Sequence, residues 1–263
     1  MADAKVSFDD GAVYERFMGR WSRAVGSIFL DWVAPQHAAR WLDVGCGTGV
    51  FTRLVLDQCA PASVVSVDPA PAQLEHARKQ RSGERVEFRL ADAQSLPFPD
   101  DAFDVVASAL VINFIADRPR ALAEMYRVCR SGGVVAGYVW DLASGRNSMW
   151  PLMNGMRRIG LAPPAVPGTE DTSLEALASL FKKAGYDDIA VRSIDVELAF
   201  PSFEDFWLSQ VPSFTPHGKV VQALSEADRA RLMEEVRIVL PVTPGGTISY
   251  SARANAIKAR VGS

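Results

Sequence analysis

The sequence contains few of the residues that build metal centres and disulfide frameworks. Its 263 residues include three cysteines and three histidines. None of the histidines has a neighbour at metal-ligand spacing, and the cysteines Cys46, Cys59 and Cys129 are scattered. Three scattered cysteines are also too few for a disulfide framework. We therefore expect neither a metal site nor a disulfide scaffold.

Other absences narrow the class of partner and the compartment. The formal net charge is −3, so the chain lacks the strong basic field that collects a phosphate backbone, and we expect no nucleic-acid partner. No apolar run reaches the roughly 18–20 residues that a membrane span needs. The acidic start MADAKVSFDD differs from a secretory signal. These features predict a cytoplasmic protein, either a monomer or a homodimer.

The chain does have a clear alternation of short apolar strands with helical segments. Strands are predicted at 40–44, 63–67, 85–90, 103–107 and 133–140, with helices between them at 50–59, 73–78 and 118–130. Alternating elements of these lengths are typical of a parallel sheet with helices on both faces. The predicted fold class is therefore α/β, doubly wound.

This alternation stops outside the central part of the chain. The elements expected there are an amphipathic helix at 12–34, an irregular segment at 141–170, a helix at 172–184, a strand at 188–198, short helices within 200–245, and a last strand around 248–256. Polar residues alternate along the last strand, which predicts an antiparallel strand near an edge with one solvated face. We predict a single domain over 1–263, with a cofactor-binding core of about 35–140 and lid or substrate insertions of about 10–34, 141–170 and 199–245.

A glycine-rich turn, GCGTG at 45–49, joins the first predicted strand to its helix. Glycine lets the backbone turn sharply and approach a ligand closely, and the helix behind offers free N–H groups. A dinucleotide fingerprint needs its third glycine at position 50, which is valine here, and a P-loop needs a lysine that this turn lacks. Both phosphate interpretations are weakened, and a nicotinamide-dependent oxidoreductase stays as a less favoured alternative.

Acidic residues stand at the ends of three successive predicted strands: Asp43, Asp68 and Asp92. Carboxyl ends of parallel strands meet at one edge of the sheet, where open α/β sheets bind ligands. A carboxylate after the second strand can accept both hydroxyl hydrogens of a ribose, and Asp92 is placed to bond an adenine amino group. One such residue alone is more often a turn or a helix cap. Three of them beside the glycine turn predict a nucleoside-binding cleft.

These residues resemble the class I S-adenosylmethionine-dependent methyltransferases, particularly the small-molecule group similar to the ubiquinone and menaquinone biosynthesis enzymes. The resemblance is carried by WLDVGCGTGVFT (41–52), VVSVDPAPAQLEHAR (64–78), ADAQSLPFPDDAFDVVASALVINFI (91–115) and ALAEMYRVCRSGGVVAGYVW (121–140). It implies a Rossmann-like, mostly parallel seven-stranded sheet whose last strand is antiparallel. It also implies S-adenosyl-L-methionine as cofactor and S-adenosyl-L-homocysteine as product.

The resemblance further implies roles for single residues around that cofactor. The methionine part would contact Asp43 and the backbone of Gly45, Cys46 and Gly47. Asp68 would bind the ribose, and Pro69 would pack on the face of the adenine. Asp92 and Ala93 would bind the edge of the adenine. Ala109 would offer a carbonyl to the methionine amine. Tyr14 and Arg20 match positions that close over the cofactor.

The predicted reaction is methyl transfer to oxygen, nitrogen or carbon of a small, partly apolar molecule. Displacement at a sulfonium carbon needs mainly proximity and alignment, so we assign no catalytic residue; Asn113 stands where many relatives carry a histidine. Candidate acceptor-site residues in the insertions are Trp140, Trp150, Phe206, Trp207, Phe214 and His217. In the alternative interpretation without an acceptor site, the aromatic residues form the core of a helical lid and His217 is a surface residue. The alternative function is a cofactor-binding or interaction module without catalysis.

Overall fold

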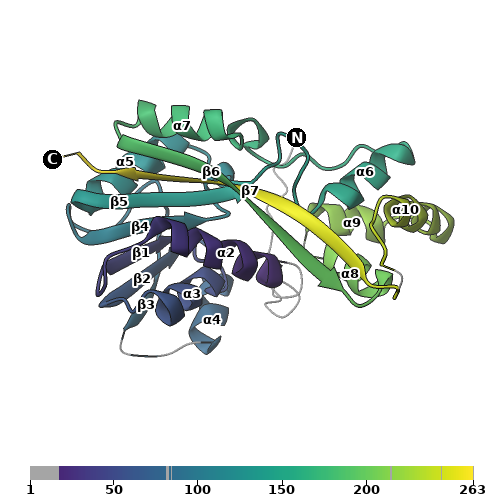
Figure 1. The fold of residues 1–263 in the computed structure, drawn as a ribbon, viewed down its shortest axis with the longest axis horizontal. Coiled ribbons are helices and arrows are strands. Elements are labelled where there is room, and N and C mark those ends of the chain that lie inside the picture. Colours follow the sequence, from purple (N-terminus) through teal and green to yellow (C-terminus); the bar gives the residue numbers. More distant parts are fainter. Residues whose placement is uncertain (1–17, 81–82, 84, 214, 244, 263) are drawn as a thin grey trace.

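The structure, a computed structural model, describes residues 18–80, 83, 85–213, 215–243 and 245–262. Tyr14 and Phe214 lie outside the described residues. The described chain forms one seven-stranded sheet in the order β3-β2-β1-β4-β5-β7-β6 (Figure 1). Its strands are β1 Arg40–Val44, β2 Ser63–Asp68, β3 Val86–Leu90, β4 Phe103–Ala109, β5 Cys129–Trp140, β6 Asp187–Phe200 and β7 Ile248–Arg260.

The strand directions confirm the predicted doubly wound sheet. Neighbours from β3 through β5 pair in parallel, and β7 pairs antiparallel with both β5 and β6. The chain order reverses at β1, which lies between β2 and β4. Ligands of open α/β sheets bind beyond the strand ends at such a reversal. The turn after β1, residues 45–49, therefore stands at the predicted position.

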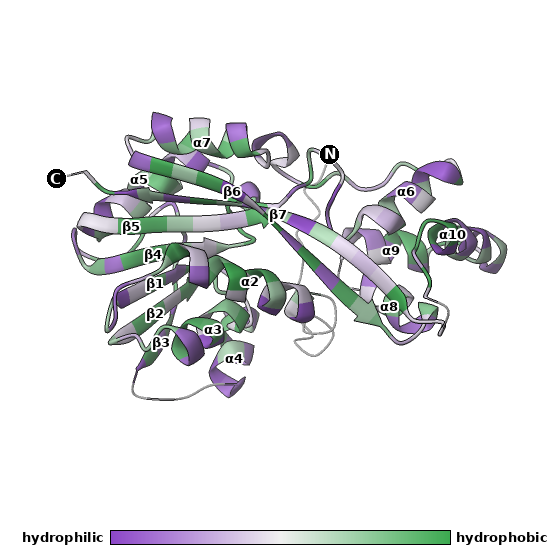
Figure 2. Cartoon of the chain, in the orientation of Figure 1, coloured by the Kyte–Doolittle hydropathy of each residue, from purple (hydrophilic) through white to green (hydrophobic). Residues whose placement is uncertain are grey.

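Helices cover both faces of the sheet because successive strand residues point to opposite sides. The helices are α2 Arg20–Val33, α3 Val50–Gln58, α4 Pro71–Gln80, α5 Arg118–Val128, α6 Trp150–Arg158, α7 Leu174–Lys183, α8 Phe203–Gln210, α9 Pro216–Gln222 and α10 Glu226–Ile238. On one face Trp41 packs with residues of α2 and α3. On the other, Leu42 packs with residues of α5 and α7. Figure 2 shows hydrophobic central strands and hydrophilic outward surfaces on α4, α7 and α10.

A second group of elements extends beyond the carboxyl ends of the parallel strands. β5 ends at Trp140, paired with Ala254, whereas β6 and β7 stay paired as far as Phe200 and Ile248. We call the cap this two-stranded extension, residues 195–200 and 248–253, together with α6, α8, α9 and α10, which gather around it (Figure 1). Helices α8, α9 and α10 each begin after a serine or threonine whose side chain accepts a backbone N–H.

Two expectations about local structure were wrong. The segment 141–170 was expected to be irregular, but it contains α6, whose Leu152 and Met156 are fully buried. A Cβ on Gly155 of that helix would lie 2.9 Å from Val236 Cγ2 on α10. Close packing against α10, rather than the helix propensity of its own residues, therefore stabilises α6. The last strand was expected to have a solvated face, but residues 254–257 are all buried, because β7 lies between β5 and β6.

Candidate active site

The turn at 45–49 has a backbone conformation that glycine adopts most readily. Gly45, Gly47 and Gly49 have φ angles of 79°, 53° and 79°. The N–H groups of Gly45 and Cys46 donate to the Val67 carbonyl at 2.8 and 2.9 Å, which holds the turn against β2. A Cβ on Gly45 would lie 2.5 Å from a Val111 methyl, whereas one on Gly47 would meet nothing nearer than 3.9 Å. The Gly47 backbone is therefore open to a ligand.

Asp68, at the end of β2, holds the same turn by hydrogen bonding. Its Oδ2 accepts the Gly47 N–H at 2.9 Å, and its Oδ1 accepts the Ala70 N–H at 2.9 Å. Burial raises the pKa of the Asp68 carboxyl, and these two hydrogen bonds counteract the rise. A carboxylate has about four acceptor positions, so two remain for a ligand. The contact between Gly47 and Asp68 was not anticipated from the sequence.

Asp43, at the end of β1, is completely buried. Its Oδ2 accepts the Thr52 hydroxyl at 2.6 Å, and that hydroxyl lies 2.9 Å from the Ser66 hydroxyl. Its Oδ1 has no hydrogen-bond partner in the described part of the chain. Burial raises the pKa of Asp43 to about 7. A cationic ligand group beside Oδ1 would satisfy the oxygen and lower this pKa again.

A small cavity of about 50 Å³ opens in front of the glycine turn. Its lining comes from α2, the turn, the start of α3, the end of β4 and β5: Ser22, Gly45, Cys46, Gly47, Thr48, Val50, Phe51, Ala109, Leu110, Val111 and Tyr138. The buried Thr48 hydroxyl has no partner among the described residues. Leu110 has a φ of 62°, a left-handed conformation that costs a bulky residue on the order of 1–3 kcal/mol and is concentrated at functional sites.

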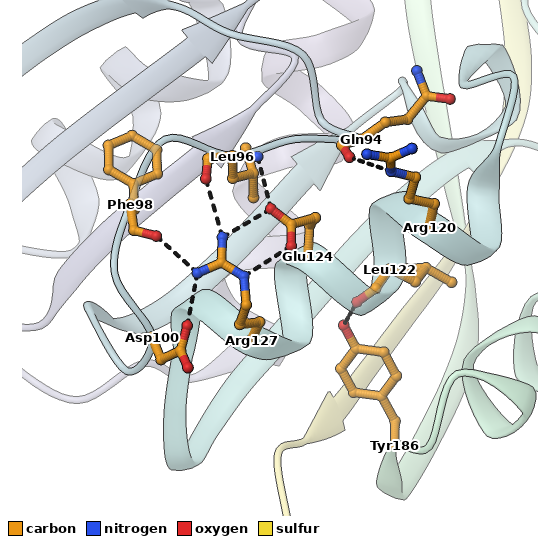
Figure 3. A network of polar contacts seen from close by, with 9 residues as sticks. All are labelled: Gln94, Leu96, Phe98, Asp100, Arg120, Leu122, Glu124, Arg127 and Tyr186. Carbon is orange, nitrogen blue, oxygen red and sulfur yellow. Dashed lines mark hydrogen bonds and ion pairs between the residues drawn. The ribbon is translucent and has the colours of Figure 1, made fainter.

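The segment after β3 carries the third acid and is held by α5 (Figure 3). Asp92 is exposed and accepts the Gln94 N–H at 2.9 Å. The guanidinium of Arg127 donates to the carbonyls of Leu96 and Phe98 at 3.0 and 2.8 Å. Glu124 pairs with that guanidinium at 2.8 Å and also accepts the Leu96 N–H. These long-range contacts, which the sequence did not reveal, fix the segment that presents Asp92.

Four predicted cofactor residues line the cavity: Gly45, Cys46, Gly47 and Ala109. Asp43, Asp68, Pro69, Asp92 and Ala93 are not among its lining residues. Pro69 directly follows Asp68 and is exposed, and Ala93 is half-buried beside Asp92. Arg20 turns to the cap instead. It pairs with Asp205 at 3.3 Å, donates to a β6 carbonyl, and stacks 4.7 Å from the ring centre of Phe200. It is not among the residues that line the cavity.

The aromatic acceptor candidates form packed contacts. Trp140 is 8% exposed and meets Trp21 edge to face at 6.0 Å, and Trp207 stacks on Phe203 at 6.2 Å. Phe206 is fully buried and Trp150 half-buried. The interpretation of these residues as lid core therefore matches their packing.

The polar acceptor candidate His217 is buried as well, and so is Asn113. His217 is 6% exposed, so the interpretation as a surface residue was wrong: α9 presents His217 and Val221 on its buried face. Asn113 lies in the short helix η2 Ile112–Phe114 and donates to the Pro167 carbonyl at 3.0 Å.

The described residues contain no group of three or more histidine, cysteine or acidic side chains placed to hold a metal ion. Within the same residues, no helix combines the length and the apolar character that crossing a bilayer requires.

Comparison with known proteins points in one direction. A family profile described as a methyltransferase domain matches residues 42–137. The ubiquinone/menaquinone biosynthesis C-methyltransferase UbiE of Dinoroseobacter shibae is 30% identical over 189 residues, covering 65% of this chain and 75% of the relative. A malonyl-(acyl-carrier protein) O-methyltransferase of Serratia marcescens is 32% identical over 164 residues, covering 60% of this chain and 58% of the relative.

The fold also matches solved structures. Phosphoethanolamine N-methyltransferase 2 of Haemonchus contortus, solved in complex with S-adenosyl-L-methionine, superposes with a TM-score of 0.61 at 18% identity. The match covers 100% of this chain and 61% of that one. At this identity the likeness concerns the fold.

Proposed function

The chain belongs to the class I S-adenosylmethionine-dependent methyltransferases, and from this premise we propose that it transfers a methyl group from S-adenosyl-L-methionine to a small, partly apolar molecule. The observation that carries the proposal is the buried Asp43, whose Oδ1 has no partner among the described residues beside an open glycine turn. A buried carboxylate oxygen without a donor is costly, and a cationic ligand removes that cost. The residues present therefore fit this cofactor.

The chain's own groups supply binding and alignment. S-adenosyl-L-methionine, when bound, supplies an electrophilic methyl group on a sulfonium sulfur. Asp43 would hold the cationic methionine part, Asp68 would accept the ribose hydroxyls, and Asp92 would accept the adenine amino group. Fixing two reactants in line is worth up to about 7–11 kcal/mol of the barrier, which accounts for a site without an evident catalytic triad.

The acceptor would bind between the cavity and the cap, whose buried residues include Phe200, Phe206 and Trp207. The relatives include both a C-methyltransferase and an O-methyltransferase, so the acceptor atom does not follow from the family. The net charge of −3 supports a small-molecule acceptor over a nucleic acid. We propose a cytoplasmic enzyme, acting as a monomer or homodimer.

Thermal unfolding with S-adenosyl-L-methionine, S-adenosyl-L-homocysteine and NADH tests the cofactor. A ligand at about 100 times its Kd stabilises the folded chain by about 2.7 kcal/mol, which is a Tm increase of roughly 5–10 °C for a chain of this size. We expect this increase with both adenosyl ligands and none with NADH. An increase with NADH alone would support the oxidoreductase alternative instead. Release of labelled methyl to an acceptor panel distinguishes an enzyme from a binding module.

A further inference from the structure

The helix α3 begins at the cavity without a side-chain cap. Its N-cap residue is Gly49, which has no side chain to accept a first-turn N–H, whereas α8, α9 and α10 each have such a cap. The first N–H groups of a helix have no acceptor within the helix, and they attract negative charge. Val50 and Phe51, the first two residues of α3, both line the cavity. The cavity is therefore bordered by an uncapped helix N-terminus.

The residue before this N-cap gives a second, independent indication of a ligand. Thr48 is 2% exposed and lines the same cavity, and its hydroxyl has no hydrogen-bond partner in the described part of the chain. A buried hydroxyl without a partner is unfavourable, and native proteins contain few of them. The backbone of Thr48 is held in place, because its carbonyl accepts a hydrogen bond from the Arg53 guanidinium at 3.2 Å. A bound oxygen atom would supply the missing partner.

The size of the cavity limits the ligand group that it can hold. A water molecule takes up about 30 Å³, so a cavity of about 50 Å³ has room for a group of a few heavy atoms. A carboxylate fits this space, whereas a nucleoside does not. Ser22 of α2 is 7% exposed and lines the same cavity, so a second hydroxyl-bearing residue borders the same few atoms.

The charges around the cavity favour an amino-acid group over a simple anion. Cys46 lines the cavity. Burial raises the pKa of its thiol, and the negative charges of Asp43 and Asp68 raise it further, so the field of these two acids reaches the cavity. An isolated anion would be repelled by that field. An amino acid carries an ammonium group beside its carboxylate, and this cation can compensate Asp43, whose Oδ1 has no partner among the described residues.

A cationic side chain is not available for the carboxylate. No arginine or lysine of the described chain is among the residues that line the cavity. Arg20, which the resemblance places over the cofactor, pairs with Asp205 at 3.3 Å and donates to the Ala199 carbonyl instead. Recognition of a carboxylate at this place therefore depends on hydroxyl and backbone N–H donors.

We propose, on the basis of the proposed function above, that Thr48 selects ligands with a free amino-acid carboxylate, because its hydroxyl and the first-turn N–H groups of α3 bind the carboxylate of the methionine part. Thr48 takes no part in methyl transfer and is a specificity-determining residue. Its hydroxyl is unsatisfied in the free protein and donates to a carboxylate oxygen in the complex. Thr48 therefore increases affinity for the cofactor at the expense of the stability of the free protein.

The first test compares two ligands by calorimetry: S-adenosyl-L-homocysteine and its decarboxylated analogue, which keeps the adenosine, the sulfur and the amine. Thr48→Val should weaken binding of S-adenosyl-L-homocysteine about tenfold or more and leave binding of the analogue unchanged. The control Thr243→Val changes an exposed threonine and should bind both ligands as the wild type does. Unchanged affinity of Thr48→Val for S-adenosyl-L-homocysteine, or an equal loss for both ligands, would overturn the inference. Arg20→Met should keep the wild-type ratio of the two Kd values, and loss of that ratio would assign the carboxylate to Arg20.

The second test measures the unliganded proteins. Valine has the shape of threonine without the hydroxyl, so Thr48→Val removes an unsatisfied polar group from the free protein and should raise its Tm. The same variant should show a smaller Tm increase than the wild type when S-adenosyl-L-homocysteine is added. A lower Tm of the unliganded variant would show that the hydroxyl is structural and would overturn the inference. Failure of the wild type to bind S-adenosyl-L-homocysteine would instead reject the proposed function.

Discussion

Replacing Asp43 by asparagine should make the stability of the protein much less dependent on pH. The carboxyl has a pKa of about 7 in the folded chain against an ordinary value of 3.8. Because the folded chain holds this proton more tightly than the unfolded chain, stability falls as pH rises from about 4 to 7. The difference of about 3 in pKa corresponds to about 4 kcal/mol at 1.4 kcal/mol for each unit.

The asparagine side chain cannot ionise, so the Asp43→Asn variant lacks this loss. Its carbonyl can still accept the Thr52 hydroxyl, but its amide leaves a donor without a partner, which costs about 1–3 kcal/mol at every pH. The informative quantity is therefore the change with pH. Relative to the wild type, the variant should gain about 4 kcal/mol in unfolding free energy between pH 4 and pH 8.

Urea denaturation at several pH values measures this difference, with Asp31→Asn as the control. Asp31 is an exposed carboxylate on α2, and its variant should run parallel to the wild type. If the curves of wild type and Asp43→Asn are also parallel within about 1 kcal/mol, Asp43 ionises normally and the reasoning from burial is refuted. The same carboxyl should release a proton when S-adenosyl-L-homocysteine binds below pH 7, which calorimetry in two buffers detects.

Three further substitutions have expected outcomes. Asp68→Ala removes two charge-assisted acceptors and should weaken S-adenosyl-L-homocysteine binding at least tenfold in calorimetry. The control variant Asp228→Ala, on α10, should bind as the wild type does. Equal binding by the wild type and both variants would show that Asp68 does not bind the ribose. Gly45→Ala should destabilise the fold more than Gly47→Ala in chemical denaturation. Both variants incur about 1–2 kcal/mol of left-handed backbone strain, but only the Cβ at position 45 would also clash with Val111. The reverse order of stabilities would contradict the geometry of the turn. Arg127→Met should raise hydrogen exchange in residues 94–100, and unchanged protection there would show that this segment is fixed by other contacts.

The sequence by itself determined the parts of this protein whose signals are local. Apolar runs between helical patterns predicted β1 to β5, and the turn at 45–49 was recognisable because its glycines are closely spaced. Asp43, Asp68 and Asp92 were placed at one edge because parallel strands end together. The positions of these acids relative to a bound cofactor, and the division into one core with insertions, stay predictions.

The tertiary structure decided what depends on contacts between distant segments. It gave Asp68 the Gly47 amide, gave the segment after Asp92 its anchor on Arg127, turned Arg20 toward Asp205, and buried His217 on α9. The pattern of residues shows which faces are apolar, but it does not show which segments pack against those faces. The pKa of Asp43 is the clearest case, because it arises from the removal of water by the whole surrounding fold.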